Sequence, residues 1–181
     1  AALDYRMVFR GGRLDEAVDD VRTMLAWWRE QEERFSLDPE SIATLGLSAG
    51  AALMWLAVDE TPTPPSHLVS IYGLYDFTWL SSRRAAWLRG RLLRTTDVST
   101  WRERSPLAHA DCPAPALVIH GTADRMSPSA HAEALAAARA HAGLRTDLHL
   151  EAGSRHGFLN DAGSAVAENC IGGIVAFLRG R

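Results

Sequence analysis

The sequence GLSAG at positions 46–50 places Ser48 in a Gly-x-Ser-x-Gly pattern. A β-prone run at 41–45 precedes it, and an apolar, helix-forming run at 51–58 follows it. A strand that turns sharply into a helix at such a serine is a nucleophile elbow, which lifts the hydroxyl clear of the sheet at the positive end of the helix. We expect Ser48 to be strained, and both glycines to be required because a Cβ at either would collide with the turn.

Asp124 and His156 each follow a strand predicted from the sequence, at 116–120 and 147–151. Because the carboxyl ends of parallel strands meet at one edge of a sheet, we expect both side chains near Ser48. A serine hydroxyl is a weak nucleophile at neutral pH, so an imidazole must accept its proton, and a buried carboxylate must orient that imidazole. The chain order Ser48, Asp124, His156 therefore predicts a catalytic triad, in preference to a turn serine with two unrelated polar residues.

Other residues compete for two of these roles. Asp76, just past the preceding strand, is the rival acid, and an Asx turn is the alternative role for Asp124. Among the other histidines, His131 and His141 lie on an alanine-rich helical run and are predicted to be solvated. His120 ends a strand, where we expect it to pack or to form a hydrogen bond.

Composition restricts the function classes further. The chain has 181 residues, a net charge of −3 and no lysine, since all 19 basic residues are arginine. This excludes Schiff-base and P-loop lysine chemistry and gives no reason to expect nucleic acid as a partner. Cys112 and Cys170 form no spaced framework, which favours a reducing, cytoplasmic compartment. No run reaches transmembrane length, and the isolated His109-x-Asp111-Cys112 pattern is a poor metal site, so we expect no metal or cofactor.

Strands alternate with helices along the whole chain, which predicts an α/β fold with a mostly parallel sheet and helices on both faces. We expect one domain over 1–181, with a small helical cap at 76–104 that is rich in tryptophan and arginine. The arginines favour a solvated cap surface over an anion-attracting mouth. The predicted strands are 2–9, 41–47, 67–72, 116–120 and 147–151, and the predicted helices are 14–35, 51–58, 128–142 and 162–178.

These motifs resemble the α/β-hydrolase superfamily, specifically the esterase and lipase branch with the hormone-sensitive-lipase-like and small carbohydrate-ester esterases. The resemblance covers essentially the whole chain and implies Ser48 as nucleophile, Asp124 as acid, His156 as base and the Ala49 amide as an oxyanion donor. Its motifs are Asp4-Tyr5-Arg6, Asp19-Asp20-Val21-Arg22, Leu37-Asp38-Pro39, Gly46-Leu47-Ser48-Ala49-Gly50, Ser105-Pro106-Leu107, His120-Gly121-Thr122-Ala123-Asp124 and His156-Gly157-Phe158.

The sequence departs from this family at its beginning. The family's oxyanion loop of the His-Gly-Gly-Gly type and its first three strands have no counterpart here, and Gly11-Gly12 is a different feature. Either the 2–9 strand then pairs directly with the 41–47 strand, or the latter is an open apolar edge that invites self-association. Since one missing oxyanion donor costs about 10²–10³ in rate, we expect this chain by itself to be weak or inactive.

The resemblance therefore predicts a serine hydrolase that cleaves small-molecule carboxylic esters through an acyl-enzyme intermediate. Two alternatives remain open at this point. One is a serine peptidase of the prolyl-oligopeptidase type, which shares the elbow and the triad order. The other is a catalytically impaired, hydrolase-like binding module, which the missing oxyanion loop favours.

Overall fold

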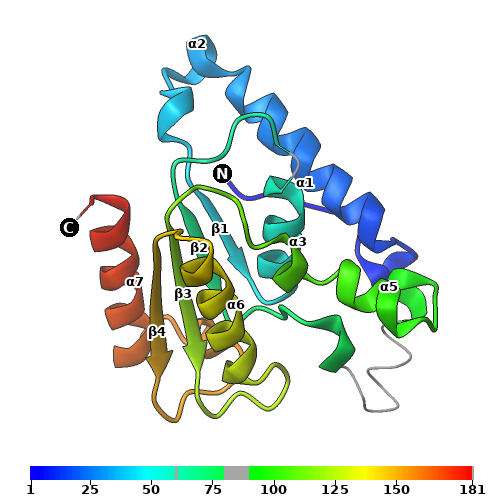
Figure 1. Ribbon diagram of the computed structural model, residues 1–181. Helices are drawn as coiled ribbons and strands as arrows, with labels where there is room; N and C mark the ends of the chain where they lie inside the picture. Colours follow the sequence, from blue (N-terminus) through cyan, green and yellow to red (C-terminus); the bar gives the residue numbers. More distant parts are fainter. Residues whose placement is uncertain (60, 80–89, 181) are drawn as a thin grey trace.

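The computed structural model describes residues 1–59, 61–79 and 90–180. Its strands form one parallel sheet in the order β1-β2-β3-β4 (Figure 1). The register aligns Thr44 with Leu68 and Ala116 with Thr146, so the carboxyl ends of all four strands lie at the same edge. The predicted α/β fold is thereby confirmed. The strands are β1 (Thr44–Leu47), β2 (Leu68–Ile71), β3 (Ala116–Gly121) and β4 (Thr146–Glu151).

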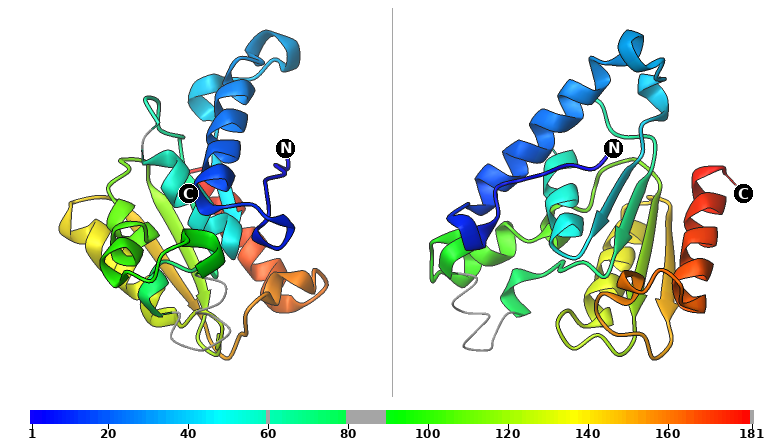
Figure 2. Two further views of the ribbon diagram at one scale, coloured as in Figure 1. Left: turned by 90° about the vertical axis from the view of Figure 1, so that its right-hand side faces the viewer. Right: turned by 180° about the vertical axis from the view of Figure 1, so that it is seen from behind.

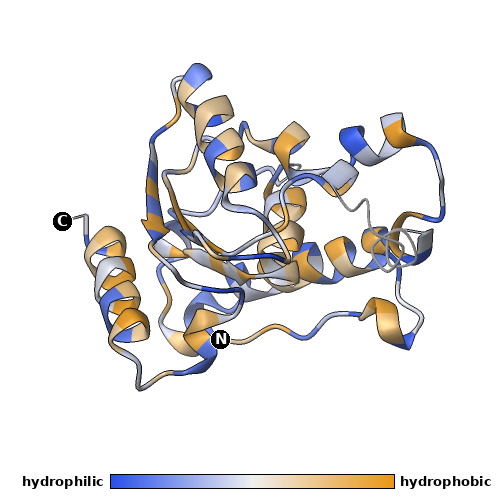
Figure 3. Ribbon diagram, turned by 90° about the horizontal axis from the view of Figure 1, so that it is seen from below, coloured by the Kyte–Doolittle hydropathy of each residue, from blue (hydrophilic) through white to orange (hydrophobic). Residues whose placement is uncertain are grey.

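Helices cover both faces of this sheet. The helices α3 (Ala49–Val58) and α6 (Ser129–His141) connect neighbouring strands in the same direction, and right-handed crossovers place both on one face. The helix α1 (Leu14–Arg29) packs on the outside of α3. On the opposite face stands α7 (Ala165–Leu178), as two further views show (Figure 2; Figure 3, from the carboxyl ends of the strands).

The core divides between these two faces according to the two-residue period of the strands. Leu68, Ala116 and Val118 face α3 and α6, whereas the alternate residues of β2 and β3 face Ile174 and Phe177 of α7. Helix α3 is buried on all sides from Ala51 to Val58 because it lies between α1 and the sheet. The elbow helix is thus the centre of the larger core.

Shorter elements occur in the described chain as well, in addition to helical residues at 90–93. They are the helices α2 (Glu32–Phe35) and α5 (Val98–Glu103) and the 3-10 helices η1 (Val8–Arg10), η2 (Pro39–Ser41), η3 (Phe77–Trp79), η4 (Pro106–His109) and η5 (Phe158–Asn160). Part of the predicted cap falls at 80–89, outside the described residues. The described part includes η3 and α5, and α5 lies beside the beginning of α1, where Arg104 pairs with Asp15 (Figures 1 and 2). A role as a cap stays a prediction.

The predicted strand at 2–9 is wrong. The chain runs without secondary structure to Met7 and then forms η1, which ends at Gly11 with a φ of +92°. Side-chain bonds to α1 hold this segment in place of sheet pairing, because Arg6 donates to both carboxylate oxygens of Asp20 at 2.8–3.1 Å. Phe9 is consequently 68% exposed.

The helix predicted at 14–35 is shorter than expected. It divides into α1 and α2 at residues 30–31, and Ser36 then takes a left-handed conformation with a φ of +51°. The strand predicted at 41–47 begins later, because Pro39 opens a 3-10 turn in which Asp38 accepts from the Glu40 amide. The later strands and helices agree with the prediction to within a few residues.

The structure decides between the two expectations for the edge at 41–47. Among the described residues β1 pairs only with β2, and Leu45 and Leu47 are 50% and 40% exposed. An apolar groove of about 630 Å³ runs between this edge, α1 and residues 1–5, and Trp28 and Met54 line it. Self-association through the edge stays a prediction.

No helix in the described ranges is both long and apolar enough to span a membrane. Cys112 and Cys170 are free thiols, and both are buried. Burial and the nearby Glu151 carboxylate, which accepts from the Cys170 thiol, raise the pKa of Cys170 to about 12.

A fully buried arginine joins the segment before β3 to the beginning of β4. The Arg139 guanidinium on α6 donates to the carbonyls of Ala110, Cys112 and Ala114 at 2.7–2.9 Å and stacks 5.0 Å over Trp55. It also donates to Thr146 Oγ1 at 2.7 Å. Burial lowers its pKa. Among the described residues no carboxylate forms an ion pair with it, so backbone carbonyls, the Thr146 hydroxyl and the Trp55 ring are its direct partners.

We expect Arg139→Met to lower the free energy of unfolding by about 3–5 kcal/mol, because it leaves several buried carbonyls without a donor. Urea titration measures this change. The control is Arg145→Met, at an exposed arginine six residues later, which should change the same quantity by less than about 0.5 kcal/mol. Equal effects of the two substitutions would contradict the assignment.

Candidate active site

The elbow has the strained geometry that the sequence predicts. Ser48 lies between β1 and α3 with a φ of +52° and a ψ of −118°, a combination that non-glycine residues rarely adopt. A Cβ added to Gly46 would lie 2.6 Å from the Ala51 Cα and the Gly50 carbonyl oxygen. The first glycine of the motif is therefore required, because helix α3 begins directly above it.

The expectation for the second glycine is wrong. A Cβ at Gly50 meets no atom within 4 Å, because this residue faces the groove beside the open β1 edge. The turn itself therefore places no requirement for glycine at position 50.

The structure brings Ser48, His156 and Asp124 together at the carboxyl edge of the sheet. Ser48 Oγ lies 2.8 Å from His156 Nε2, and His156 Nδ1 lies 2.7 Å from Asp124 Oδ2. With the imidazole proton on Nδ1, His156 donates to the carboxylate and accepts from the serine hydroxyl. The Asp124 side chain is fully buried, whereas that of His156 is 19% exposed, so the imidazole is within reach of a substrate.

Two loops approach each other closely to allow this contact. Gly121, at the end of β3, lies so close to the Ser154 backbone that a Cβ would overlap it. The Ala123 amide donates to the Ser154 carbonyl at 3.0 Å, and the Gly153 amide donates to Thr122 Oγ1 at 2.9 Å. The loop that carries Asp124 is thereby tied to the loop that carries His156.

The rival acid does not take part in this arrangement. Asp76 Oδ1 accepts from the backbone amide and the hydroxyl of Thr78, at 2.8 and 2.7 Å. The carboxylate that contacts His156 is that of Asp124, as the sequence predicted.

The surroundings of two other histidines go beyond what the sequence indicated. His131, expected to be solvated, is buried and meets Trp79 in an edge-on ring contact, whereas His141 is exposed. His120 is fully buried beside Asp124, and its Nε2 lies 3.4 Å from Asp124 Oδ2. His120 was expected to pack or to form a hydrogen bond at the end of its strand, and it does both, but its closeness to Asp124 was not predicted.

Aromatic side chains flank the imidazole. The ring of Tyr72 lies 5.1 Å from that of His156 and 5.2 Å from that of Phe158. Tyr72 follows β2 with a φ of +38°, a second strained residue at the same edge, and burial raises its pKa. The motif His156-Gly157-Phe158 already indicated that Phe158 lies close to His156. No sequence pattern indicated the strained backbone of Tyr72.

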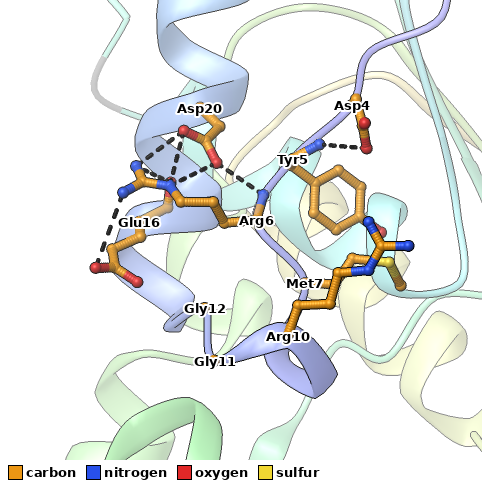
Figure 4. Close-up of a pocket in the computed structure, with 9 residues that line it drawn as sticks. All are labelled: Asp4, Tyr5, Arg6, Met7, Arg10, Gly11, Gly12, Glu16 and Asp20. Atoms are coloured by element: carbon orange, nitrogen blue, oxygen red, sulfur yellow. Dashed lines mark hydrogen bonds and ion pairs between the residues drawn. The ribbon is translucent and has the colours of Figure 1, made fainter.

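The other polar clusters lie elsewhere. His109 contacts Asp59 Oδ2 at 2.6 Å and the Glu103 carbonyl at 2.8 Å. Within the described ranges, no three His, Cys, Asp or Glu side chains converge as metal ligands. A pocket of about 570 Å³ is lined by residues 4–7 and 10–12 with Glu16 and Asp20 (Figure 4). Arg6 in this pocket pairs with Asp20, and neither Ser48, Asp124 nor His156 lines the pocket.

This arrangement of sheet, elbow and loops is that of an α/β-hydrolase. An esterase from the Planctomycetes species Thermogutta terrifontis superposes with a TM-score of 0.79 over 97% of this chain and 68% of its own, at 24% identity. Other structures of that esterase superpose similarly. One holds propionate (TM-score 0.77, 24% identity), and one is phosphoramylated by tabun (TM-score 0.79, 25% identity).

The chain belongs to the prolyl oligopeptidase family, which its residues 9–169 match. It is also similar to two curated Mycobacterium tuberculosis proteins. The probable carboxylic ester hydrolase LipM is 31% identical over 70% of this chain and 34% of its own length. Esterase LipC is 32% identical over 87% of this chain and 44% of its own. The chain therefore spans between a third and a half of these relatives, which are homologues of the esterase type.

The elbow geometry makes opposite predictions for its two glycines. Gly46→Ala should lower the free energy of unfolding by about 1–3 kcal/mol or prevent folding, because the new methyl group meets backbone atoms. Gly50→Ala, in the first turn of α3, should leave stability unchanged or raise it by up to about 1 kcal/mol. Thermal unfolding compares the two, and equal destabilisation would contradict the described turn.

Stability should also depend on the buried histidines. Burial lowers the pKa of both His120 and His131 from the ordinary value of 6.5. Below that pH the unfolded chain therefore binds more protons than the folded one. The free energy of unfolding should thus fall as the pH drops below about 6.5, by up to about 1.4 kcal/mol per pH unit for each histidine.

Urea midpoints between about pH 8 and pH 5.5 measure this dependence. His131→Gln should flatten the slope, whereas His141→Gln, at an exposed histidine, should leave it unchanged. A slope that His131→Gln does not alter would contradict the role of that residue.

Proposed function

We propose that this chain carries the catalytic triad of a serine hydrolase that cleaves carboxylic esters. The observation that supports this best is the unbroken chain of contacts from Ser48 Oγ through His156 to Asp124, at 2.8 and 2.7 Å. The similarity to curated ester hydrolases supports the ester as the substrate class.

In the proposed reaction Ser48 Oγ attacks the ester carbonyl carbon while His156 Nε2 takes the hydroxyl proton. Asp124 stabilises the resulting imidazolium through its contact with Nδ1. The tetrahedral intermediate collapses when His156 returns the proton to the leaving alcohol, which gives an acyl-Ser48 ester. His156 then activates a water molecule, which releases the carboxylic acid and restores the serine.

The charge on the substrate oxygen requires donors placed in advance. Ala49 is the first residue of α3, so its amide has no carbonyl partner within the helix and is our proposed donor. Such sites usually have a second oxyanion donor. Without one, we expect this chain alone to hydrolyse esters about 10²–10³-fold more slowly than with both donors.

A second candidate function is peptide hydrolysis, which the match to the prolyl oligopeptidase family favours. It would use the same three residues, but His156 would protonate an amine leaving group. Parallel assays with nitrophenyl acyl esters and aminoacyl nitroanilides separate the two. A higher kcat/KM on the amides would replace the ester proposal.

The most direct test is intact-mass analysis after incubation with a fluorophosphonate, which needs an activated serine but little substrate binding. We expect one adduct on the wild-type chain and none on Ser48→Ala, with labelling at least about 10³-fold slower in His156→Ala. Ser129→Ala, at the first residue of α6, is the matched control and should label normally.

The outcomes separate the proposed classes. An adduct retained in Ser48→Ala would remove Ser48 as the nucleophile. A folded wild-type chain that forms no adduct would favour the third reading, a hydrolase-like binding module.

A further inference from the structure

A second histidine contacts the carboxylate of the triad. His120 lies at the end of β3, and both it and the Asp124 side chain are fully buried. Its Nε2 lies 2.7 Å from the Ser127 carbonyl oxygen and 3.4 Å from Asp124 Oδ2, the oxygen that also contacts His156. His120 and His156 therefore approach the same carboxylate oxygen from two different strands.

The loop that carries Asp124, residues 122–128 between β3 and α6, depends on His120 for its shape; we call it the acid loop. Asp124 Oδ1 accepts from the amides of Met126 and Ser127 at 2.8 and 2.9 Å, which fixes one side of the carboxylate. Ser127 in turn donates its hydroxyl to the Gly73 carbonyl at 2.6 Å. The His120 N–H closes the loop by holding the Ser127 carbonyl, so Oδ2 is left facing His156.

The protonation of His120 follows from these partners. A hydrogen bond to a carbonyl requires the proton on Nε2, so in the neutral ring Nδ1 carries only a lone pair. Nδ1 is buried without a hydrogen-bond partner among the described residues. A buried, unpaired nitrogen is destabilising and is seldom retained where an apolar side chain would fill the same space. The free-energy cost of burying Nδ1 unpaired therefore indicates that the hydrogen bonds made by Nε2 have a role.

We propose that His120 is a positioning residue, which holds Asp124 in the orientation in which Oδ2 accepts the hydrogen bond from His156 Nδ1. It touches no reacting atom and acts through the acid. This inference rests on the proposed function for its effect on rate, but its geometric part can be tested without any turnover.

The geometric test uses a matched pair of variants of the full chain. Gln at position 120 retains a donor at the place of Nε2, whereas Met has nearly the same length and no donor. In nitrogen-15-labelled protein, the His156 Nδ1 proton should resonate far downfield in wild type and in His120→Gln. In His120→Met the signal should vanish through exchange or move upfield.

Two further variants complete this test. His120→Asn has an amide too short to reach the Ser127 carbonyl, so it should behave like His120→Met and replaces it if that variant does not fold. His131→Met makes the same chemical change at another buried histidine and should leave the signal unchanged.

The kinetic test follows fluorophosphonate labelling and ester turnover of the same variants. The loss of a hydrogen bond that orients a charged group should lower kcat and the labelling rate of His120→Met by about 10- to 100-fold, with KM nearly unchanged. His120→Gln should recover most of that loss. A purely structural role would reduce the fraction of active protein without this rescue by Gln.

Each outcome is decisive. A folded His120→Met variant with the wild-type His156 signal would overturn the inference, as would equal losses in His120→Gln and His120→Met. The absence of the signal in folded wild type would overturn it as well, because there would be no bond to hold. Failure of Ser48 labelling with an intact signal would instead refute the proposed function alone.

Discussion

The contact between Gly46 and the first turn of α3 is the constraint on which the site depends. It forces Ser48 into a strained backbone conformation, which costs about 1–3 kcal/mol. The burial of α3 between α1 and the sheet offsets that cost, since every residue from Ala51 to Val58 is removed from solvent. The strain at Ser48 and the packing of α3 therefore depend on each other.

The second requirement is that two loops from different strands meet at the serine. The parallel register brings the ends of β3 and β4 level, and Gly121 lets their loops touch. Asp124 is then held by backbone amides, His156 and the carbonyl-bound His120. The positions of the three side chains are thus set mainly by the backbone at the carboxyl edge of the sheet.

Much of this could be read from the sequence because the signals were local. The elbow, the strand before each of Asp124 and His156, and the chain order of the three residues all follow from short patterns. The failures were of another kind. Residues 2–9 have a strand-like composition, but the bidentate contact between Arg6 and Asp20 holds them along α1.

Burial was the other property that local patterns did not reveal. His131 lies in an alanine-rich, polar-looking run, yet Trp79 covers it from a distant segment. His120 has its partner seven residues away in a loop whose path no periodicity predicts. There is room for a side chain at Gly50 because the groove beside the β1 edge lies next to it, and the Gly-x-Ser-x-Gly motif does not encode that groove.

Arg139 has a consequence for how the molecule opens. Its guanidinium binds the 110–114 segment, which precedes β3, and Arg145 and Thr146, where β4 begins. Because the buried charge cannot lose these partners one at a time without exposing the others, α6, the 110–114 segment and the start of β4 should open together. Their amide hydrogens would then exchange with solvent as a single cooperative unit.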